Sequence, residues 1–129
     1  MPASPWKLLR PAEPDREYLV LLSYLPLRRF RDFPTFAVHD GRVTRQLADA
    51  RGLVGYSKLG RPWAKRFWTL SAWEDDAALA AFIHAGSHAR AMTGMQPRMG
   101  PTRFVRWNLP GSALPPTWDD ALRRWAAVE

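Results

Sequence analysis

The segment LVGYSKLGRPWAKRFWTLSAW, residues 53–73, predicts a β-hairpin, and this hairpin decides the fold of the chain. Two strand-like stretches, Leu53–Leu59 and Arg66–Trp73, flank a Gly-Arg-Pro sequence that is typical of a turn. Successive side chains of a strand point to opposite faces of a sheet. We therefore expect Trp68 on one face of the sheet and Trp73 on the other.

On each side of the hairpin the sequence predicts one further helix and one further strand. Residues 18–25 (YLVLLSYL) are almost continuously apolar, as in a strand that is covered on both faces. Residues 34–51 have helical spacing and end before a glycine. Residues 74–94 predict a second helix that opens with acidic side chains, and residues 102–109 predict a fourth strand. The order is strand, helix, hairpin, helix, strand.

This order predicts an α+β fold of the ferredoxin-like kind, a split βαβ arrangement with a four-stranded antiparallel sheet and helices on one face. Strands this apolar cannot leave the other face exposed to water, so we expect a second copy to cover it and form a dimeric α/β barrel. Residues 1–17 are rich in proline and predict an extended arm. Residues 18–129 predict a single domain that ends in a helix, residues 117–129, with Trp118, Leu122 and Trp125 on one side.

Composition narrows the range of functions. The 129 residues contain no cysteine, which excludes disulfides, thiolate nucleophiles and cysteine-based metal sites. The net charge is +7, but the arginines are scattered and form no nucleic-acid motif, so we expect no nucleic-acid partner. No apolar stretch is long enough for a signal peptide or a membrane span. We therefore expect a cytoplasmic protein with no membrane partner.

The sequence RFWTLSAWED at residues 66–75, followed by Ala78-Leu79, Phe82 and His88, resembles the third strand and second helix of the antibiotic-biosynthesis-monooxygenase-like superfamily. The similarity is sharpest across residues 52–92. A weaker resemblance to carotenoid-oxidising spheroidene monooxygenase-like proteins lies around Trp73 and in the Gly-Ser-His sequence that ends at His88. The superfamily resemblance implies a dimeric barrel with a pocket between sheet and helices. Some members of the superfamily oxygenate aromatic polyketides without a cofactor, whereas others bind or degrade haem.

We therefore expect a monooxygenase-like protein that oxidises a hydrophobic aromatic or polyene small molecule without a cofactor. His88 is the predicted catalytic base, because an imidazole with a pKa near 6.5 accepts a proton around neutral pH. The alternative for His88 is that it only packs or caps a turn of helix. Two alternative functions also stay open: a protein that binds haem or another small ligand without turnover, and a non-catalytic dimeric structural domain.

The predicted substrate contacts are aromatic walls, hydrogen-bond donors and neighbours of His88 on the second helix: Trp73, Trp68, Arg66, Tyr56, Tyr24, Phe82, His84 and Met92. His84 and His88 are four residues apart, but no third ligand is adjacent, so we predict no metal site. In haem-degrading relatives the ligand histidine would fall near Met92. The methionine departs from that pattern, and haem is kept only as the alternative to a cofactor-free pocket.

Overall fold

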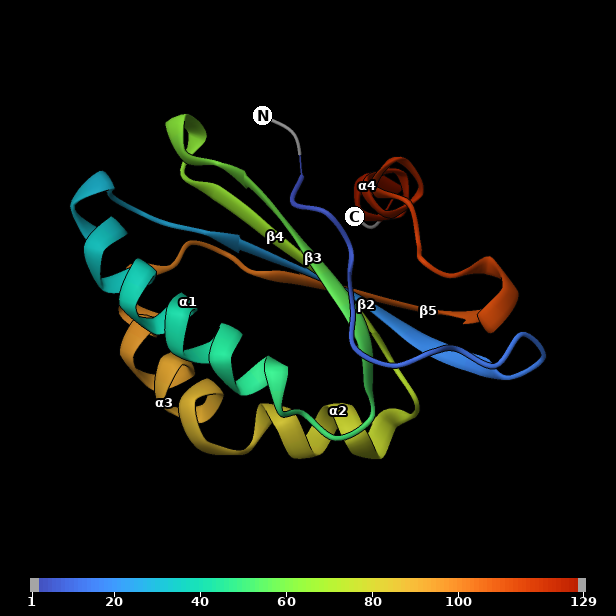
Figure 1. Ribbon diagram of the computed structural model, residues 1–129. Helices are drawn as coiled ribbons and strands as arrows, with labels where there is room; N and C mark the ends of the chain where they lie inside the picture. The colour runs from blue at the N-terminus through green and yellow to red at the C-terminus, as the bar shows by residue number, and fades with distance from the viewer. Residues whose placement is uncertain (1–2, 128–129) are drawn as a thin grey trace.

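The computed structural model describes residues 3–127, and an antiparallel sheet with helices on both faces organises them (Figure 1). The strand order in the sheet is β1-β3-β4-β2-β5. The strands are β1 (Lys7–Leu8), β2 (Glu17–Pro26), β3 (Leu53–Arg61), β4 (Arg66–Trp73) and β5 (Arg103–Pro110). The helices are α1 (Phe33–Ala48), α2 (Asp76–Ile83), α3 (Gly86–Met95) and α4 (Trp118–Ala127), and four short 3-10 helices are η1 (Phe30–Asp32), η2 (Pro62–Ala64), η3 (Gln96–Arg98) and η4 (Gly111–Ala113).

The predicted α+β fold of the ferredoxin-like kind is confirmed. The β3–β4 hairpin forms the antiparallel pair expected from residues 53–73, with Leu59 opposite Trp68. The strand β2 lies between β4 and β5 and is antiparallel to both. Because β2 is the central strand and is covered on both sides, its sequence needs the nearly continuous apolar character that predicted it.

The sheet has five strands instead of the predicted four, because part of the N-terminal arm joins it. Lys7 pairs with Tyr56 and Leu8 with Gly55, which places β1 at the edge beside β3. Gly55 makes this docking possible: a Cβ atom at that position would lie 2.6 Å from Cε2 of Trp6 and 2.8 Å from the Lys7 carbonyl oxygen. Two residues of the N-terminal arm, Lys7 and Leu8, thus belong to the sheet.

The predicted second helix, residues 74–94, is in fact two helices. The carboxylate of Asp75 accepts a hydrogen bond from the backbone N–H of Ala78 (2.8 Å) and begins α2. α2 ends at Ile83, and Gly86, with φ +49°, starts α3 in a new direction. Only glycine adopts such a left-handed conformation without strain, which explains why the helix breaks at this point. His84 and His88 therefore do not share one regular helix.

The sheet is covered on both faces by the chain itself. Helices α1, α2 and α3 lie against one face, and α4 lies against the other (Figure 1). Under α4 the side chains of Val20, Leu22 and Leu70 are 0% exposed, as is Ala121 of α4 itself. The expectation of an uncovered apolar face, on which the dimeric barrel was predicted, is therefore wrong. Within residues 3–127, no helix is both long enough and apolar enough to cross a membrane.

Candidate functional site

An apolar pocket of about 450 Å³ lies at the N-terminal end of α1. The rings of Phe33 and Phe36 project from the first turns of α1 toward Phe67 at the start of β4. Ring centroids are 4.6 Å apart for Phe36 and Phe67, and 5.6 Å apart for Phe33 and Phe67. The complete lining is Phe33, Pro34, Phe36, Ala37, Asp40, Pro62 and Phe67. The pocket is thus walled by aromatic rings from two elements that are distant in sequence.

One end of this apolar pocket is polar. Oδ2 of Asp40 lies 2.9 Å from Nζ of Lys58, which also donates a hydrogen bond to the hydroxyl of Thr44. The Thr44 hydroxyl in turn donates to the backbone carbonyl of Asp40 (2.7 Å). Asp40 follows Phe33 and Phe36 on α1 at helical spacing, so the carboxylate and the rings share one face of the helix. Apolar walls with a few convergent polar groups are typical of small-molecule sites.

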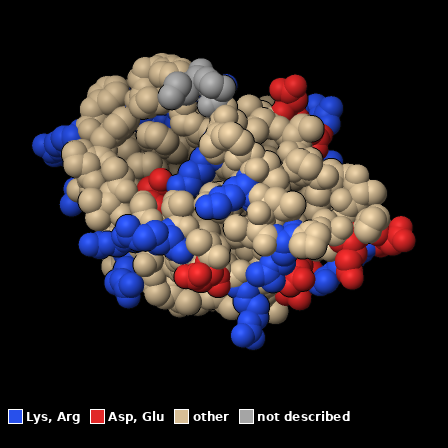
Figure 2. Space-filling model, in the orientation of Figure 1, with Lys and Arg blue, Asp and Glu red and all other residues tan. Residues whose placement is uncertain are grey.

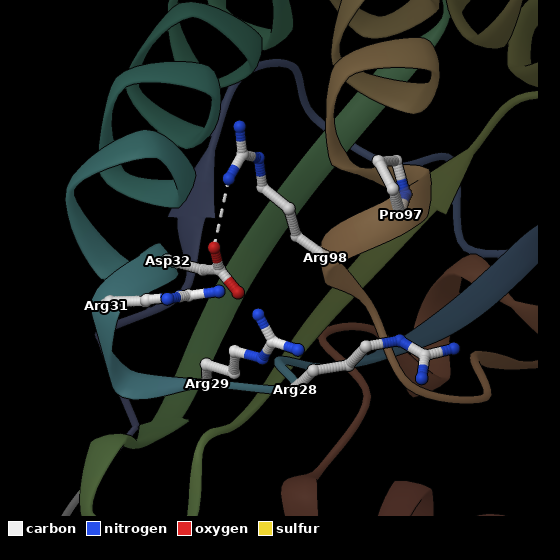
Figure 3. Close-up of a pocket in the computed structure, with 6 residues that line it drawn as sticks. All are labelled: Arg28, Arg29, Arg31, Asp32, Pro97 and Arg98. Atoms are coloured by element: carbon white, nitrogen blue, oxygen red, sulfur yellow. Dashed lines mark hydrogen bonds and ion pairs between the residues drawn. The ribbon is translucent and has the colours of Figure 1, made fainter.

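A second pocket, of about 410 Å³, is polar and lies beside the segment that leads into α1. Its lining is Arg28, Arg29, Arg31, Asp32, Pro97 and Arg98 (Figure 3). The residues come from the connection between β2 and α1 and from η3.

His88 lies near the break between α2 and α3 and is half-buried. Its ring meets the ring of Phe82 edge-on, with centroids 5.2 Å apart, and Nδ1 lies 3.1 Å from the carbonyl oxygen of Ile83. Gln46 of α1 bridges the break: its Oε1 accepts from the His88 backbone N–H (2.7 Å), and its Nε2 donates to the carbonyls of Phe82 and Ala85 (3.1 Å each). These contacts fix the position of the imidazole.

Burial lowers the pKa of His88 below 6.5, partly opposed by the hydrogen bond to the Ile83 carbonyl, and the charge of His84 lowers it slightly further. A neutral imidazole is therefore favoured at neutral pH. A carbonyl oxygen only accepts hydrogen bonds, so in the neutral ring Nδ1 carries the proton. Nε2 then keeps its lone pair and is the nitrogen able to act as a base.

The other predicted site residues divide between the two faces of the sheet. Trp73 and Tyr56 lie on the sheet face that α1 and α2 cover, and Phe82 of α2 packs on Trp73 with ring centroids 5.3 Å apart. Trp68 and Tyr24 lie on the opposite face, beneath α4, as the alternation in β4 predicted for the two tryptophans. His84 and Met92 are exposed, Met92 to 54%, and Arg66 is exposed at the start of β4.

None of the nine predicted residues lines either of these two pockets. No functional role was predicted from the sequence for Phe33, Phe36, Asp40 or Lys58. The available signal was the spacing of two phenylalanines and one carboxylate on the same face of a predicted helix.

The pockets do not fit haem or a metal ion. Haem iron takes a histidine, cysteine, methionine or tyrosine ligand, and no such residue lines either pocket. Among residues 3–127, no three histidine, aspartate or glutamate side chains come together as a metal-binding group.

No protein-family model matches the sequence, and no curated protein is significantly similar to it. Solved structures are similar in fold. The "Putative antibiotic biosynthesis monooxygenase" of Nitrosomonas europaea superposes with a TM-score of 0.65 at 17% identity, over 78% of this chain and 93% of its own. SnoaB, a cofactor-independent oxygenase from Streptomyces nogalater, gives a TM-score of 0.55 at 12% identity, over 70% of this chain and 90% of its own.

A conserved Bacteroides thetaiotaomicron protein of unknown function, named as a possible oxidoreductase, gives a TM-score of 0.62 at 12% identity, over 73% of this chain and 99% of its own. At these identities the comparison establishes the fold and leaves the chemistry to be argued from the residues. The chain has the α+β fold shared by antibiotic-biosynthesis-monooxygenase-like proteins and SnoaB-type oxygenases.

Proposed function

We propose that this protein is a monooxygenase-like enzyme that binds a hydrophobic aromatic or polyene small molecule in the apolar pocket. The observation that carries the proposal is the pocket itself, with Phe33, Phe36 and Phe67 as walls and Asp40 at one end. Aromatic rings favour offset or edge-on contact with a flat conjugated ligand. The fold that the chain shares with a cofactor-independent oxygenase also supports an oxygenase function.

The chemistry needs a base and a group that holds the resulting anion. Removing a proton from a phenol or an activated methylene gives an anion that can pass electrons to dioxygen. If a methylene becomes a carbonyl, one oxygen atom enters the product and the other leaves as water, so the substrate itself supplies the electrons. No external reductant is required.

Asp40 and Lys58 are suited to these two roles. Asp40 is the only titratable side chain among the residues that line the apolar pocket, and it takes the proton in this proposal. The Lys58 ammonium group does not line the pocket itself but lies 2.9 Å from Asp40 at its polar end, and in this proposal it stabilises the enolate or phenolate. His88, with Nε2 as its basic atom, stays the base predicted from the sequence, although it does not line this pocket. Variants of the two candidate bases distinguish them.

The first test measures the binding of 1-naphthol to the protein, using the fluorescence of 1-naphthol as the signal. Ala37→Trp fills the pocket and should weaken binding about tenfold or more, a loss of about 1.4 kcal/mol. Ala81→Trp places the same side chain on the exposed part of α2, outside the pocket, and should leave binding unchanged. Equal affinity in the two variants would place the aromatic site elsewhere.

Turnover is tested with anthrone, a polycyclic ketone with an acidic methylene, in an oxygen electrode. Lys58→Met should keep anthrone binding and reduce oxygen uptake, because it removes the group that holds the anion and leaves the aromatic walls in place. Loss of uptake in Asp40→Asn, with His88→Ala unaffected, supports Asp40 as the base, and the reverse result supports His88. Binding without oxygen uptake would favour the alternative of a ligand-binding protein without turnover.

A further inference from the structure

We propose that the arginine-lined pocket is a binding site for the phosphate monoester group of a small molecule. This site is separate from the aromatic pocket, and the proposal does not depend on the oxygenase function. Its cavity of about 410 Å³ is larger than a phosphate group alone and leaves space for a small organic part of the ligand.

The first argument is the imbalance of charge. Four arginines and a single carboxylate line the cavity. The Asp32 side chain is only 7% exposed and pairs with Arg98, with Nη1 of Arg98 3.0 Å from Oδ1 of Asp32. Within residues 3–127, Arg28, Arg29 and Arg31 form no ion pair with any carboxylate. Like charges held close together repel, and a bound anion relieves that repulsion.

The second argument is the direction of the side chains. The guanidinium groups of Arg29, Arg31 and Arg98 gather around the Asp32 carboxylate, whereas Arg28 runs away from it (Figure 3). Nε of Arg28 donates to the carbonyl of Met99 (2.6 Å), which fixes this side chain to the neighbouring segment. Arg98 alone pairs with Asp32, so the positive charges of Arg29 and Arg31 are left for a ligand.

The third argument is that backbone hydrogen bonds join the two segments that form the pocket. The backbone N–H of Arg28 donates to the carbonyl of Arg98 (2.9 Å), and that of Gly100 donates to the carbonyl of Pro26 (2.9 Å). Leu27 and Met99 form an isolated β-bridge between the same two segments. A site whose backbone is already in place loses less entropy when a ligand binds.

A phosphate monoester suits this site better than a carboxylate does. It carries about −1.5 to −2 charges at neutral pH and has three terminal oxygens. Each guanidinium group can donate two parallel hydrogen bonds to such oxygens. A single carboxylate would neutralise only one of the two excess charges.

Basic side chains outside the arginine-lined pocket provide the control. Lys and Arg side chains are spread over several parts of the face in Figure 2, among acidic ones. Arg42 and Arg51 are both exposed, and neither lines the cavity. The double variant Arg42→Gln/Arg51→Gln therefore lowers the net charge as much as Arg29→Gln/Arg31→Gln does, but leaves the cavity intact.

The experiment titrates the protein with phenyl phosphate and with benzoate at constant ionic strength, by calorimetry and by phosphorus NMR. We expect one phenyl phosphate site per chain, at least about tenfold weaker in Arg29→Gln/Arg31→Gln and within about twofold of the original in Arg42→Gln/Arg51→Gln. Thermal melting curves of both double variants serve as the control that they are folded. The Asp32→Asn variant, which frees Arg98 from its partner, should bind phenyl phosphate more tightly.

Three outcomes would overturn the proposal. Equal weakening in the two double variants would mean that the anion responds only to overall charge. Benzoate binding as tight as that of phenyl phosphate would assign the pocket to carboxylates. No saturable binding of phenyl phosphate up to about 10 mM would mean that the cavity is not an anion site at all.

Discussion

Nη1 of Arg98 lies 3.0 Å from Oδ1 of Asp32, and this ion pair joins two residues that are 66 positions apart in the sequence. Asp32 is the last residue of η1 and directly precedes α1, whereas Arg98 is the last residue of η3. The pair therefore fixes the start of α1 to the segment that follows α3. Its two ends differ in burial, because the Asp32 side chain is 7% exposed and the Arg98 side chain 44%.

Asp32→Ala should lower the free energy of unfolding by about 2 kcal/mol, because Arg98 then loses its carboxylate partner and the only negative charge in the arginine-lined pocket is removed. Arg98→Ala should cost about 1 kcal/mol, since Arg98 is partly solvated and Arg29 and Arg31 still line the pocket that contains Asp32. Urea denaturation measures both changes. Asp15→Ala, at an exposed position, is the control and should be neutral. A larger cost for Arg98→Ala than for Asp32→Ala would contradict this account.

The lowered pKa of His88 predicts a pH dependence of stability. In the unfolded chain His88 takes up its proton near pH 6.5, whereas in the folded chain it does so only at lower pH. The stabilising contribution is therefore complete above about pH 6.5 and is lost as the pH falls below that value. Urea denaturation at pH 5 and pH 7 should show a smaller pH-dependent decrease in stability for His88→Ala than for the unchanged protein. His84→Ala should retain most of the decrease.

Ala121 has no exposed surface and faces the sheet from α4, so it tests how firmly α4 covers the tryptophans below. Ala121→Asp should push α4 off the sheet, because a buried unpaired carboxylate is costly. Ala126→Asp makes the same change at an exposed position of α4 and should have no effect. With α4 displaced, the apolar sheet face is free, and sedimentation should show association of Ala121→Asp to about twice 14.8 kDa.

We therefore predict that the dimeric barrel forms only when α4 leaves the sheet. A dimer in which α4 stays in place would have to use another surface. If Ala121→Asp and the unchanged protein sediment alike and both remain monomeric, the face beneath α4 is not an association surface.

Gly55→Ala should release the N-terminal arm. The added Cβ atom would overlap both the indole of Trp6 and the backbone of Lys7, so β1 could not stay paired with β3. Hydrogen exchange should become faster at the backbone N–H of Leu9, which donates to the Val54 carbonyl (2.8 Å) at the end of this pairing. Gly41→Ala is the control, because a Cβ atom there meets no neighbour within 4 Å. Unchanged exchange at Leu9 in Gly55→Ala would mean that the arm adapts to the methyl group.

Four of the five strands could be predicted from the sequence because their signals are local. The apolar pattern and the turn residues of the sequence predict both the hairpin at residues 53–73 and the central strand around residues 18–25. The alternation in β4 was sufficient to separate Trp68 from Trp73. Each of these inferences uses residues that are neighbours in the chain.

The position of α4 and the two pockets could not be predicted in this way. The amphipathic pattern of residues 117–129 indicates that one side is buried, but not which surface buries it. The apolar pocket forms where Phe36 of α1 meets Phe67 of β4, and the arginine pocket where Asp32 meets Arg98. Contacts between segments that are distant in sequence depend on tertiary packing, and a local sequence pattern does not predict them.

The tryptophans gathered in and beneath α4 make tryptophan fluorescence a probe of that side of the sheet. Of the seven tryptophans, five (Trp6, Trp68, Trp107, Trp118 and Trp125) belong to the cluster on that face. Trp73 lies in the opposite cluster, and Trp63 is 61% exposed. Five of the seven indoles therefore lie in one layer, and a substitution that displaces α4 or the arm should shift the tryptophan emission to longer wavelength as that layer becomes hydrated.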